Sequence, residues 1–344
     1  MIKKRTTKRR SSTSSYTSLS NDGLVGLRNL GNTCFMNSIL QCLSNTRLLK
    51  DYCSKEDYID DLNKSSSMKG QLMTAFAELI QSLWMKNADT VNPSAFKHQI
   101  QKFAPRFVGY SQQDSQEFLR FLLEGLHDDI NKVLRKPRYN EEISDDLTDM
   151  EKAREAWNRY TSRENSRIVD IFVGQLKSTL QCTVCRHCSV TFDPFWDLSL
   201  PIPKASKNST YNYSYSSSYD DEISLKDCFK LFTKDEILDG VEKPTCSQCQ
   251  EKRKCTKKLT IQKFPKILVL HLKRFSAHGY RSKLSTLVDY PRSNLRLDDF
   301  SATGCAPPYD LYGVSNHSGS TYGGHYTAYC KHAASDRWYT YDDT

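Results

Sequence analysis

Apolar residues in the first half of the chain recur at helical spacing. Leu72, Phe76, Leu79, Ile80 and Leu83 fall on positions that share one face of an α-helix. The same spacing predicts three more helices between Leu24 and about Arg163. Their apolar positions are Phe35, Ile39, Leu40 and Leu43 in the first, Phe96, Ile100 and Phe103 after the capping pair Asn92-Pro93 in the second, and Phe118, Leu122, Leu126 and Ile130 in the third.

The pattern changes to that of strands from about Ile168. Residues 172–176 and 267–272 are apolar runs, and the second is continuous enough to predict a central strand covered on both faces. Residues 323–330 and 337–342 predict two further strands around a turn of small and polar residues. Because helices come first and strands follow, the sequence favours the α+β class over alternating α/β.

Two segments have a composition that does not predict regular structure. Residues 1–22 are rich in Lys and Arg and then in Ser, and we expect a disordered tail. Residues 204–222 are rich in Tyr and Ser, and they predict a long exposed loop. A binding patch is the alternative for this loop, but the run 208–219 contains no Lys or Arg.

The net charge of +9 is concentrated at one end of the chain. Six Lys and Arg residues and no acidic residue stand in the first ten positions, so the remaining 334 residues carry only +3. This balance argues against a nucleic-acid-binding body. No apolar run approaches the ~18 residues of a membrane span, and no secretory signal is recognisable. We expect a monomeric cytoplasmic protein, also nuclear if the basic tail is a nuclear address; an acidic-surface tether and a solvated tail are the alternatives.

Twelve cysteines in a chain of this kind argue against a disulfide framework. Cys182 and Cys185 form one C-x2-C pair, and Cys246 and Cys249 form another. Two such turns supply the four thiolates of a closed structural Zn²⁺ site. Four unrelated buried thiols are the alternative, and Cys188 could replace a ligand because it stands three residues after Cys185.

Cys34 is the candidate nucleophile. It follows a Gly-Asn turn and opens an apolar helical stripe, which places it in the first turn of a helix. The helix dipole and the free N–H groups there are expected to lower the pKa of its thiol. Taken alone, such a cysteine is as readily explained as a buried core thiol.

The last two predicted strands supply a base and an acid. A hairpin in which Lys331 faces Asp336 places His325 directly opposite Asp342 and turns Asp343 to the other face. A carboxylate at that distance can orient the imidazole. The result is a Cys/His/Asp set of the kind used for acyl transfer.

These segments resemble the ubiquitin-specific proteases, cysteine peptidases of the papain-like superfamily. Residues 26–38 are similar to the Cys box of that family, and His317-Ser-Gly with residues 323–329 is similar to its His box. Residues 112–119 and 270–275 and the two C-x2-C pairs match further family blocks. The likeness runs from about Leu24 to the last residue.

The resemblance implies a papain-like fold with a helical thumb near 24–165, zinc-bearing fingers near 168–262 and a palm near 263–344. By position, Cys34 resembles the nucleophile, His325 the general base and Asp342 the third member of the triad. Asn29 matches the donor to the oxyanion, and a turn role is its alternative. His317 is expected to shape the loop and not to act as a base.

The resemblance also implies a substrate. Asp114 and Glu117 match positions that receive the arginines of ubiquitin's tail, although Asp114 could instead cap a helix. Gly323 and Gly324 would let backbone approach a diglycine end. The implied activity is a thiol hydrolase that cleaves the (iso)peptide bond after ubiquitin's C-terminal glycine, with ubiquitin and ubiquitinated proteins as partners.

Other function classes remain open at this point. The first alternative is a catalytically weak or inactive ubiquitin-binding scaffold, and a zinc-dependent nucleic-acid module is the weakest. Chains of the family normally continue for one or two strands past the Asp-Asp pair, whereas this chain stops at Thr344. We therefore expect C-terminal strands to be missing and Asp342 to lie on a fraying end.

Overall fold

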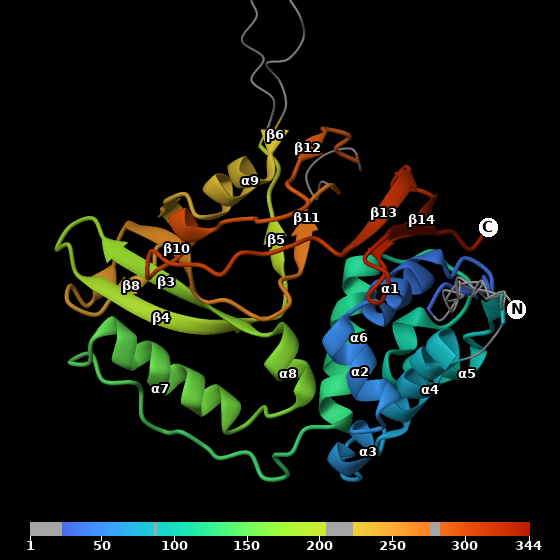
Figure 1. The fold of residues 1–344 in the computed structure, drawn as a ribbon. Helices are drawn as coiled ribbons and strands as arrows, with labels where there is room; N and C mark the ends of the chain where they lie inside the picture. The colour runs from blue at the N-terminus through green and yellow to red at the C-terminus, as the bar shows by residue number, and fades with distance from the viewer. Residues whose placement is uncertain (1–22, 86–87, 204–222, 276–282) are drawn as a thin grey trace, which may run out of the picture.

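The computed structural model describes residues 23–85, 88–203, 223–275 and 283–344. The predicted tail at 1–22 and the predicted loop at 204–222 lie outside the described residues. Most helices gather at one end of the molecule, and the longest strands extend at the other (Figure 1). The α+β class predicted from the sequence is confirmed.

Six helices make up the helical end, and the predicted apolar stripes form its core. They are α1 (Cys34–Ser44), α2 (Arg47–Ser54), α3 (Tyr58–Asp61), α4 (Gln71–Met85), α5 (Ser94–Phe103) and α6 (Ser115–Asp129). Leu72, Phe76 and Ile80 of α4 are fully buried in that core. Two boundaries shift by one residue, because Pro93 is the N-cap of α5 and Ile130 lies just beyond α6.

A short helix occupies the place where the sequence predicted the change to strands. This helix, α8 (Arg167–Phe172), begins at Ser166, whose hydroxyl accepts a hydrogen bond from the N–H of Val169 at 3.2 Å. The expectation of a strand at 172–176 is wrong for its first two residues, since β3 begins at Gly174. A short apolar run fits a buried helix as well as a strand, and the serine cap decides between them here.

A four-stranded antiparallel sheet extends away from the helices (Figure 1). Its order is β4 (Cys188–Phe195), β3 (Gly174–Cys182), β10 (Cys255–Lys263) and β7 (Glu236–Leu238). The helix α7 (Asp149–Thr161) packs against β4, although its residues fall in the range expected for the thumb. At the tip, β8 (Thr245–Cys246) and β9 (Glu251–Lys252) form a small hairpin.

Short parallel pairs and one helix connect this sheet to the helical end. The pairs are β5 (Leu198–Leu200) with β11 (Leu270–Leu272), and β6 (Ile223–Ser224) with β12 (Val288–Asp289); the helix is α9 (Leu225–Phe232). The predicted central strand at 267–272 is wrong in extent and in place. Only three of its residues are extended, and they are half-buried in a two-stranded sheet.

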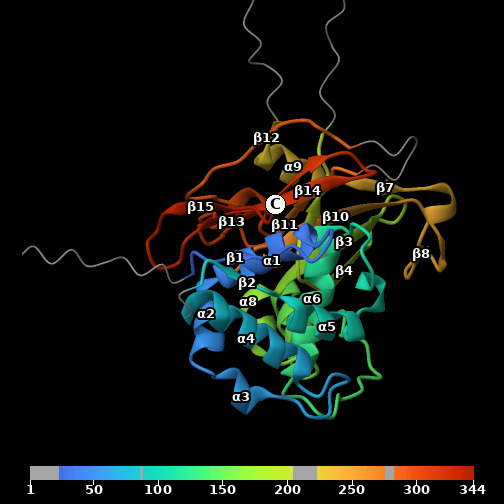
Figure 2. The same ribbon diagram turned by 90° about the vertical axis from the view of Figure 1, so that its right-hand side faces the viewer.

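The C-terminal sheet is β13 (Gly313–Gly319), β14 (Gly324–Lys331) and β15 (Trp338–Tyr341), all antiparallel. Helix α1 lies between this sheet and the other helices, and it packs against β14 and β13 (Figure 2). Beside α1, β1 (Gly26–Leu27) pairs with β2 (Thr90–Val91) (Figure 2). Within the described residues, no helix combines the length and the apolar character that crossing a membrane needs.

A buried carboxylate joins α4 to the end of α6. Asp129 is fully buried, and its two oxygens accept hydrogen bonds from the N–H groups of Gly70, Leu72 and Met73 at 2.8–3.0 Å and from the hydroxyl of Ser66 at 2.6 Å. These N–H groups belong to the first turn of α4 and the residue before it, so the carboxylate caps that helix.

Replacing this carboxylate should destabilise the whole helical end. We expect Asp129→Ala to lower the free energy of unfolding by at least about 3 kcal/mol, because it leaves several buried donors without a partner. Urea unfolding followed by circular dichroism measures this. Asp60→Ala, at an exposed acidic residue of α3, is the matched control and should change stability by less than about 0.5 kcal/mol. Equal stability of the two variants would contradict the capping role.

Candidate active site

Cys34 is the first residue of α1, as the sequence predicted, and its side chain is buried. A tight turn before the helix places Cys34 in this position. The Oδ1 of Asn29 accepts hydrogen bonds from the N–H groups of Gly31 at 3.0 Å and Thr33 at 3.3 Å. Gly31 and Asn32 have positive φ of 93° and 54°, which the glycine adopts without strain. The turn fixes the start of the helix and with it the position of the thiol.

The predicted lowering of the Cys34 pKa is wrong for the free protein. Burial raises the pKa of this thiol, and the negative charge of Asp343 raises it further. Hydrogen bonding from the backbone at Tyr326 and Phe35 acts in the other direction without outweighing them. The thiol is therefore protonated at rest, and a base must remove its proton before it can act as a nucleophile.

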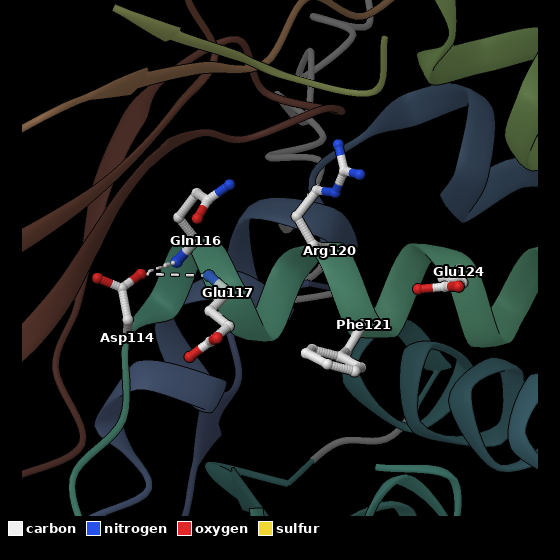
Figure 3. A pocket seen from close by; sticks show the side chains of 6 residues that line it. All are labelled: Asp114, Gln116, Glu117, Arg120, Phe121 and Glu124. Atoms are coloured by element: carbon white, nitrogen blue, oxygen red, sulfur yellow. Dashed lines mark hydrogen bonds between the residues drawn. The ribbon is translucent and has the colours of Figure 1, made fainter. Parts of the chain in front are cut away.

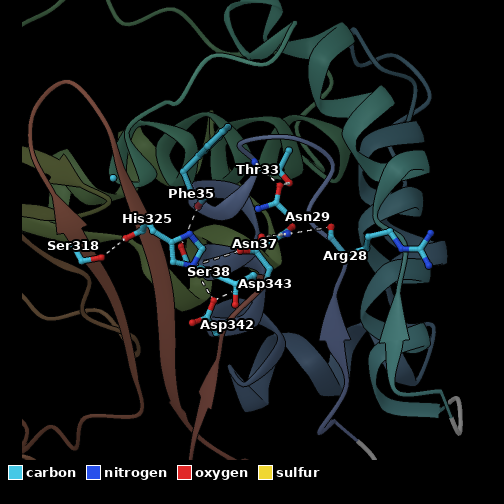
Figure 4. A network of polar contacts seen from close by, with 12 residues as sticks. Arg28, Asn29, Thr33, Phe35, Asn37, Ser38, Ser318, His325, Asp342 and Asp343 are labelled. Carbon is cyan, nitrogen blue, oxygen red and sulfur yellow. Dashed lines mark hydrogen bonds and ion pairs between the residues drawn. The ribbon is translucent and has the colours of Figure 1, made fainter.

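His325 and Asp342 meet as the sequence predicted. The Nε2 of His325 lies 2.8 Å from the Oδ1 of Asp342 (Figure 4). The hydrogen bond from His325 lowers the pKa of Asp342, so this carboxylate is ionised and can only accept. Nε2 consequently carries the proton, which leaves Nδ1 as the basic nitrogen. No hydrogen bond joins His325 to Cys34 among the residues described here.

The strand register behind this contact differs from the prediction. Lys331 faces Trp338 and not Asp336, although the Lys331 ammonium and the Asp336 carboxylate form an ion pair at 2.7 Å. The register is displaced by two residues, which keeps the side chains of β15 on their predicted faces. Asp342 follows the last paired residue, Tyr341, so the contact between its carboxylate and His325 does not depend on this register.

Asp343 does not turn away from the imidazole, and that prediction is wrong. Strand β15 ends at Tyr341, so the alternation of faces ends there too. The Oδ1 of Asp343 lies 3.8 Å from the Nε2 of His325, and its side chain is only 6% exposed. Burial raises the pKa of this carboxylate, while a 2.6 Å hydrogen bond from the Nδ2 of Asn37 supports its charge (Figure 4). Two carboxylates thus converge on one histidine.

The residues around Asp342 contact the body of the molecule. The hydroxyl of Tyr341 donates to the carbonyl oxygen of Gly23 at 3.1 Å. Asn37 of α1 binds Asp343, and the N–H of Thr344 donates to the Oδ1 of Asp342 at 3.1 Å. Helix α1, which begins at Cys34, thus holds the residue next to Asp342 through Asn37.

Asn29 makes the turn contacts that the sequence left as its alternative role, and these contacts use only its amide oxygen. Its Oδ1 organises the turn before Cys34, which was the alternative role. No partner for its Nδ2 is found among the described residues, and this amide group stays available as a donor. Both roles are compatible, because the amide has two ends.

The two glycines of the predicted tail site serve different purposes. A Cβ on Gly324 would lie 2.2 Å from the carbonyl oxygen of Ser318 and 2.3 Å from the Nε2 of His317. Glycine is therefore required here by the chain's own β13, and not only by a ligand. A Cβ on Gly323 would meet nothing closer than 3.6 Å. His317 packs on Tyr326 with ring centroids 4.6 Å apart, in keeping with its expected structural role.

An acidic groove runs along α6. Asp114, Gln116, Glu117, Arg120, Phe121 and Glu124 line a space of about 500 Å³ (Figure 3). Asp114 is the N-cap of α6, and its Oδ1 accepts from the N–H groups of Gln116 and Glu117. The capping alternative is thus observed, and no described residue donates a hydrogen bond to the second carboxylate oxygen. Glu117 is paired with Arg106 of this chain.

The four predicted metal ligands lie together at the tip of the long sheet. The sulfur atoms of Cys182, Cys185, Cys246 and Cys249 are all within 4.8 Å of one another, and those of Cys185 and Cys246 are 3.5 Å apart. Tetrahedral Zn²⁺ with bonds of about 2.3 Å would separate its sulfur ligands by about 3.8 Å. The cluster can therefore hold one metal ion of this kind.

Two other cysteines near the tip differ from expectation. Cys188, which the sequence left as a possible replacement ligand, lies outside the cluster; it is exposed on β4 and accepts a 3.4 Å hydrogen bond from the Nε2 of Gln181. Cys255 is buried beside the cluster, because it faces Cys182 across β3 and β10. The sequence analysis missed Cys255. It also missed Asn37, a polar residue on the buried side of the helix that begins at Cys34.

The charge of Asp343 should control when Cys34 becomes reactive. Replacing it by asparagine keeps the shape and removes the charge that opposes the thiolate, so the pKa of Cys34 should fall. We expect Asp343→Asn to shift the pH profile of Cys34 alkylation by iodoacetamide toward lower pH, with up to about tenfold faster reaction below the midpoint. Mass spectrometry of the labelled peptide measures it. Asp336→Asn, in the exposed turn before β15, should leave the profile unchanged; a profile independent of Asp343 would refute the coupling.

Comparison with known proteins identifies the family. The family model described as ubiquitin carboxyl-terminal hydrolase matches residues 25–344. Ubiquitin carboxyl-terminal hydrolase 2 of Bos taurus is 56% identical over 330 residues, which cover 95% of this chain and 52% of that protein. The protein of the same name from Gallus gallus is 58% identical over 325 residues, covering 94% of this chain and 87% of that protein. The chain thus spans about half the length of the bovine protein.

A solved structure agrees with these relatives. The SAGA Ubp8/Sgf11/Sus1/Sgf73 DUB module bound to ubiquitin aldehyde contains a chain with a TM-score of 0.68 and 27% identity. The match covers 94% of this chain and 65% of that one. The family and the fold therefore agree, and this chain belongs to the ubiquitin carboxyl-terminal hydrolase family.

Proposed function

We propose that the chain is a deubiquitinating thiol hydrolase that cleaves the (iso)peptide bond after the C-terminal glycine of ubiquitin. The observation that carries the proposal is the contact of His325 with Asp342 on a sheet that packs against the helix beginning at Cys34. Cys34 opens α1, His325 stands on the strand that packs against α1, and Asp342 binds the imidazole at 2.8 Å. The membership of the family supports this reading.

The geometry supports a separate role for each of these side chains in the reaction. The Nδ1 of His325 takes the proton of the Cys34 thiol, and the sulfur attacks the carbonyl carbon of the terminal glycine. The tetrahedral oxyanion forms within reach of a donor from the turn before α1, for which the free Nδ2 of Asn29 is suited. The imidazolium then protonates the leaving amine, and water releases the thioester with His325 as base. Asp342 and Asp343 stabilise the imidazolium.

The groove along α6 suits a basic, narrow tail. Asp114, Glu117 and Glu124 line it, and its single Arg120 is already engaged by Asp197 at 2.8 Å. Arginines of ubiquitin's tail would find carboxylates here for charge-assisted hydrogen bonds. Glu117 must then exchange its pairing with Arg106 or share it, so Asp114 and Glu124 are the freer acceptors.

The cysteine cluster supports a structural zinc site. Backbone hydrogen bonding at Cys185 lowers the pKa of Cys182 to about 6, and backbone hydrogen bonding at Cys249 lowers the pKa of Cys246. Cys182 and Cys246 thus favour the thiolate, the form that binds Zn²⁺, whereas the side-chain hydrogen bond with Cys185 raises the pKa of Cys249 to about 12. Bound zinc would tie β3 to the hairpin of β8 and β9, and all four positions would be filled by protein, which leaves it no catalytic role.

We also propose where the protein acts and with whom. Ubiquitin and ubiquitinated proteins are the proposed partners, and a monomer is the proposed state. The cytoplasm is the proposed location, and the Lys/Arg-rich residues 1–10 are the reason to include the nucleus.

Covalent capture tests the activity directly. Ubiquitin carrying a C-terminal electrophile should form an adduct with the protein, and Cys34→Ala should form none. With a fluorogenic ubiquitin substrate, Cys34→Ala and His325→Ala should lose at least about 1,000-fold in turnover. Cys305→Ala, which removes an exposed thiol elsewhere, should keep both capture and turnover. Tight binding of ubiquitin without capture by the unmodified chain would favour the scaffold instead.

Metal analysis tests the zinc site. Purified protein should contain about one equivalent of zinc, and Cys246→Ser should lose it and lower the midpoint of thermal unfolding. Cys188→Ser is the matched control, because Cys188 lies outside the cluster, and it should retain the metal. A metal-free protein with an unchanged melting temperature would refute the site, and loss of zinc from Cys188→Ser would show that the ligand set is wrong.

A further inference from the structure

Gln112 makes an unusual pair of contacts with the active-site hairpin. It lies in the segment before α6, 212 positions from Gly324. Its Nε2 donates to the carbonyl oxygen of Gly324 at 2.8 Å, and its Oε1 accepts from the N–H of Gly324 at 2.9 Å. Among the described residues Gln112 has no other hydrogen-bond partner. Both ends of the side-chain amide are thus hydrogen-bonded to the glycine that precedes His325.

The contact covers an open strand edge. Gly324 is the first residue of β14 and stands opposite Gly319 of β13. On its other side, β14 pairs with β15 only from Ala328 to Lys331. Residues 324–327 therefore have no strand alongside them there within the described chain. A residue of an added antiparallel strand would form the same pair of hydrogen bonds, one to the N–H and one to the C=O of a single partner residue. The amide of Gln112 occupies one such place.

This edge is where an extended substrate tail would pass. Gly324 is adjacent in sequence to His325, which must reach the scissile bond, and Asp114 of the acidic groove is two residues from Gln112. A diglycine end offers the same N–H and C=O groups that the Gln112 amide offers. Both contacts are exposed at Gln112, so water can replace either of them.

We propose that the side chain of Gln112 occupies the binding site of the substrate tail in the free protein. In the free protein its amide takes the place of one peptide unit of the substrate tail on Gly324, and the arriving tail displaces it. The proposal rests on the proposed function, since it concerns how the ubiquitin tail gains its place. Gln112 then sets the affinity for ubiquitin without taking part in the chemical steps.

The size of the effect follows from the population of the displaced state. Two exposed hydrogen bonds contribute little net free energy, so the amide is displaced for a minor but appreciable fraction of the time. The apparent dissociation constant equals the intrinsic one divided by that fraction. Removing the amide should therefore tighten binding by about 3- to 10-fold.

Binding is measured in a background that cannot react. Calorimetric titration with ubiquitin should give a dissociation constant about 3- to 10-fold lower for Cys34→Ala/Gln112→Ala than for Cys34→Ala. With Cys34 present, Gln112→Ala should lower KM by a similar factor and leave kcat unchanged. Gln113→Ala is the matched control, because its Nε2 donates to the carbonyl oxygen of Arg106 at 3.4 Å and not to Gly324. It should change neither constant.

A second measurement follows the amide itself. The side-chain ¹⁵N–¹H₂ signals of Gln112, assigned by their loss in Gln112→Ala, should move on addition of ubiquitin to Cys34→Ala and exchange faster with water. Unchanged signals would overturn the proposal. Weaker or equal binding of ubiquitin by the double variant would also overturn it. A fall in kcat for Gln112→Ala would overturn it as well, because Gln112 would then be a structural residue that positions the hairpin. Failure of Cys34→Ala to bind ubiquitin would instead overturn the proposed function, and this inference with it.

Discussion

The packing of α1 against β14 places the candidate nucleophile and base relative to each other. Cys34 and His325 stand near opposite ends of the chain, and no hydrogen bond joins them among the described residues. Their positions are set by the buried apolar face of α1, by Ala328 and Cys330 of β14, and by the 2.9 Å contact between the hydroxyls of Ser38 and Ser315. A closely packed interface transmits small shifts, so the relative position of Cys34 and His325 depends on how closely α1 packs against β14.

The second carboxylate gives the site an electrostatic bias. Asp343 is nearly buried between α1 and the end of β15, and the hydrogen bond from Asn37 offsets part of the cost of burying its charge. In addition to burial, a negative charge there raises the pKa of Cys34 and so disfavours charge on its sulfur. The resting thiol is then a poor target for oxidants, whose reaction requires the thiolate. It becomes nucleophilic only when His325 accepts its proton.

Sequence alone predicted four of the helices, α1, α4, α5 and α6, and the pairing of His325 with Asp342, for physical reasons that also explain its errors. A 3.6-residue period extends over four turns in α4, whereas the six residues of α8 are too few to separate helix from strand. The hairpin register failed because the turn closes between His332 and Arg337, with Asp336 at a φ of 59°. Because the error is two residues, the side chains of β15 remain on the face of the sheet that was predicted for them. Asp343 could not be placed, since it lies beyond the end of the strand.

The same hairpin explains why the site needs a removable cover. Because β15 pairs with only the last four residues of β14, the segment that carries His325 keeps an open edge, and open edges invite pairing with any extended chain. A permanent strand there would block the place where a substrate backbone must lie. A side-chain amide satisfies the N–H and C=O of Gly324 at the cost of two exposed hydrogen bonds, and it leaves when a longer partner arrives. The gap between β15 and the start of β14 thus makes room for both the base and its substrate.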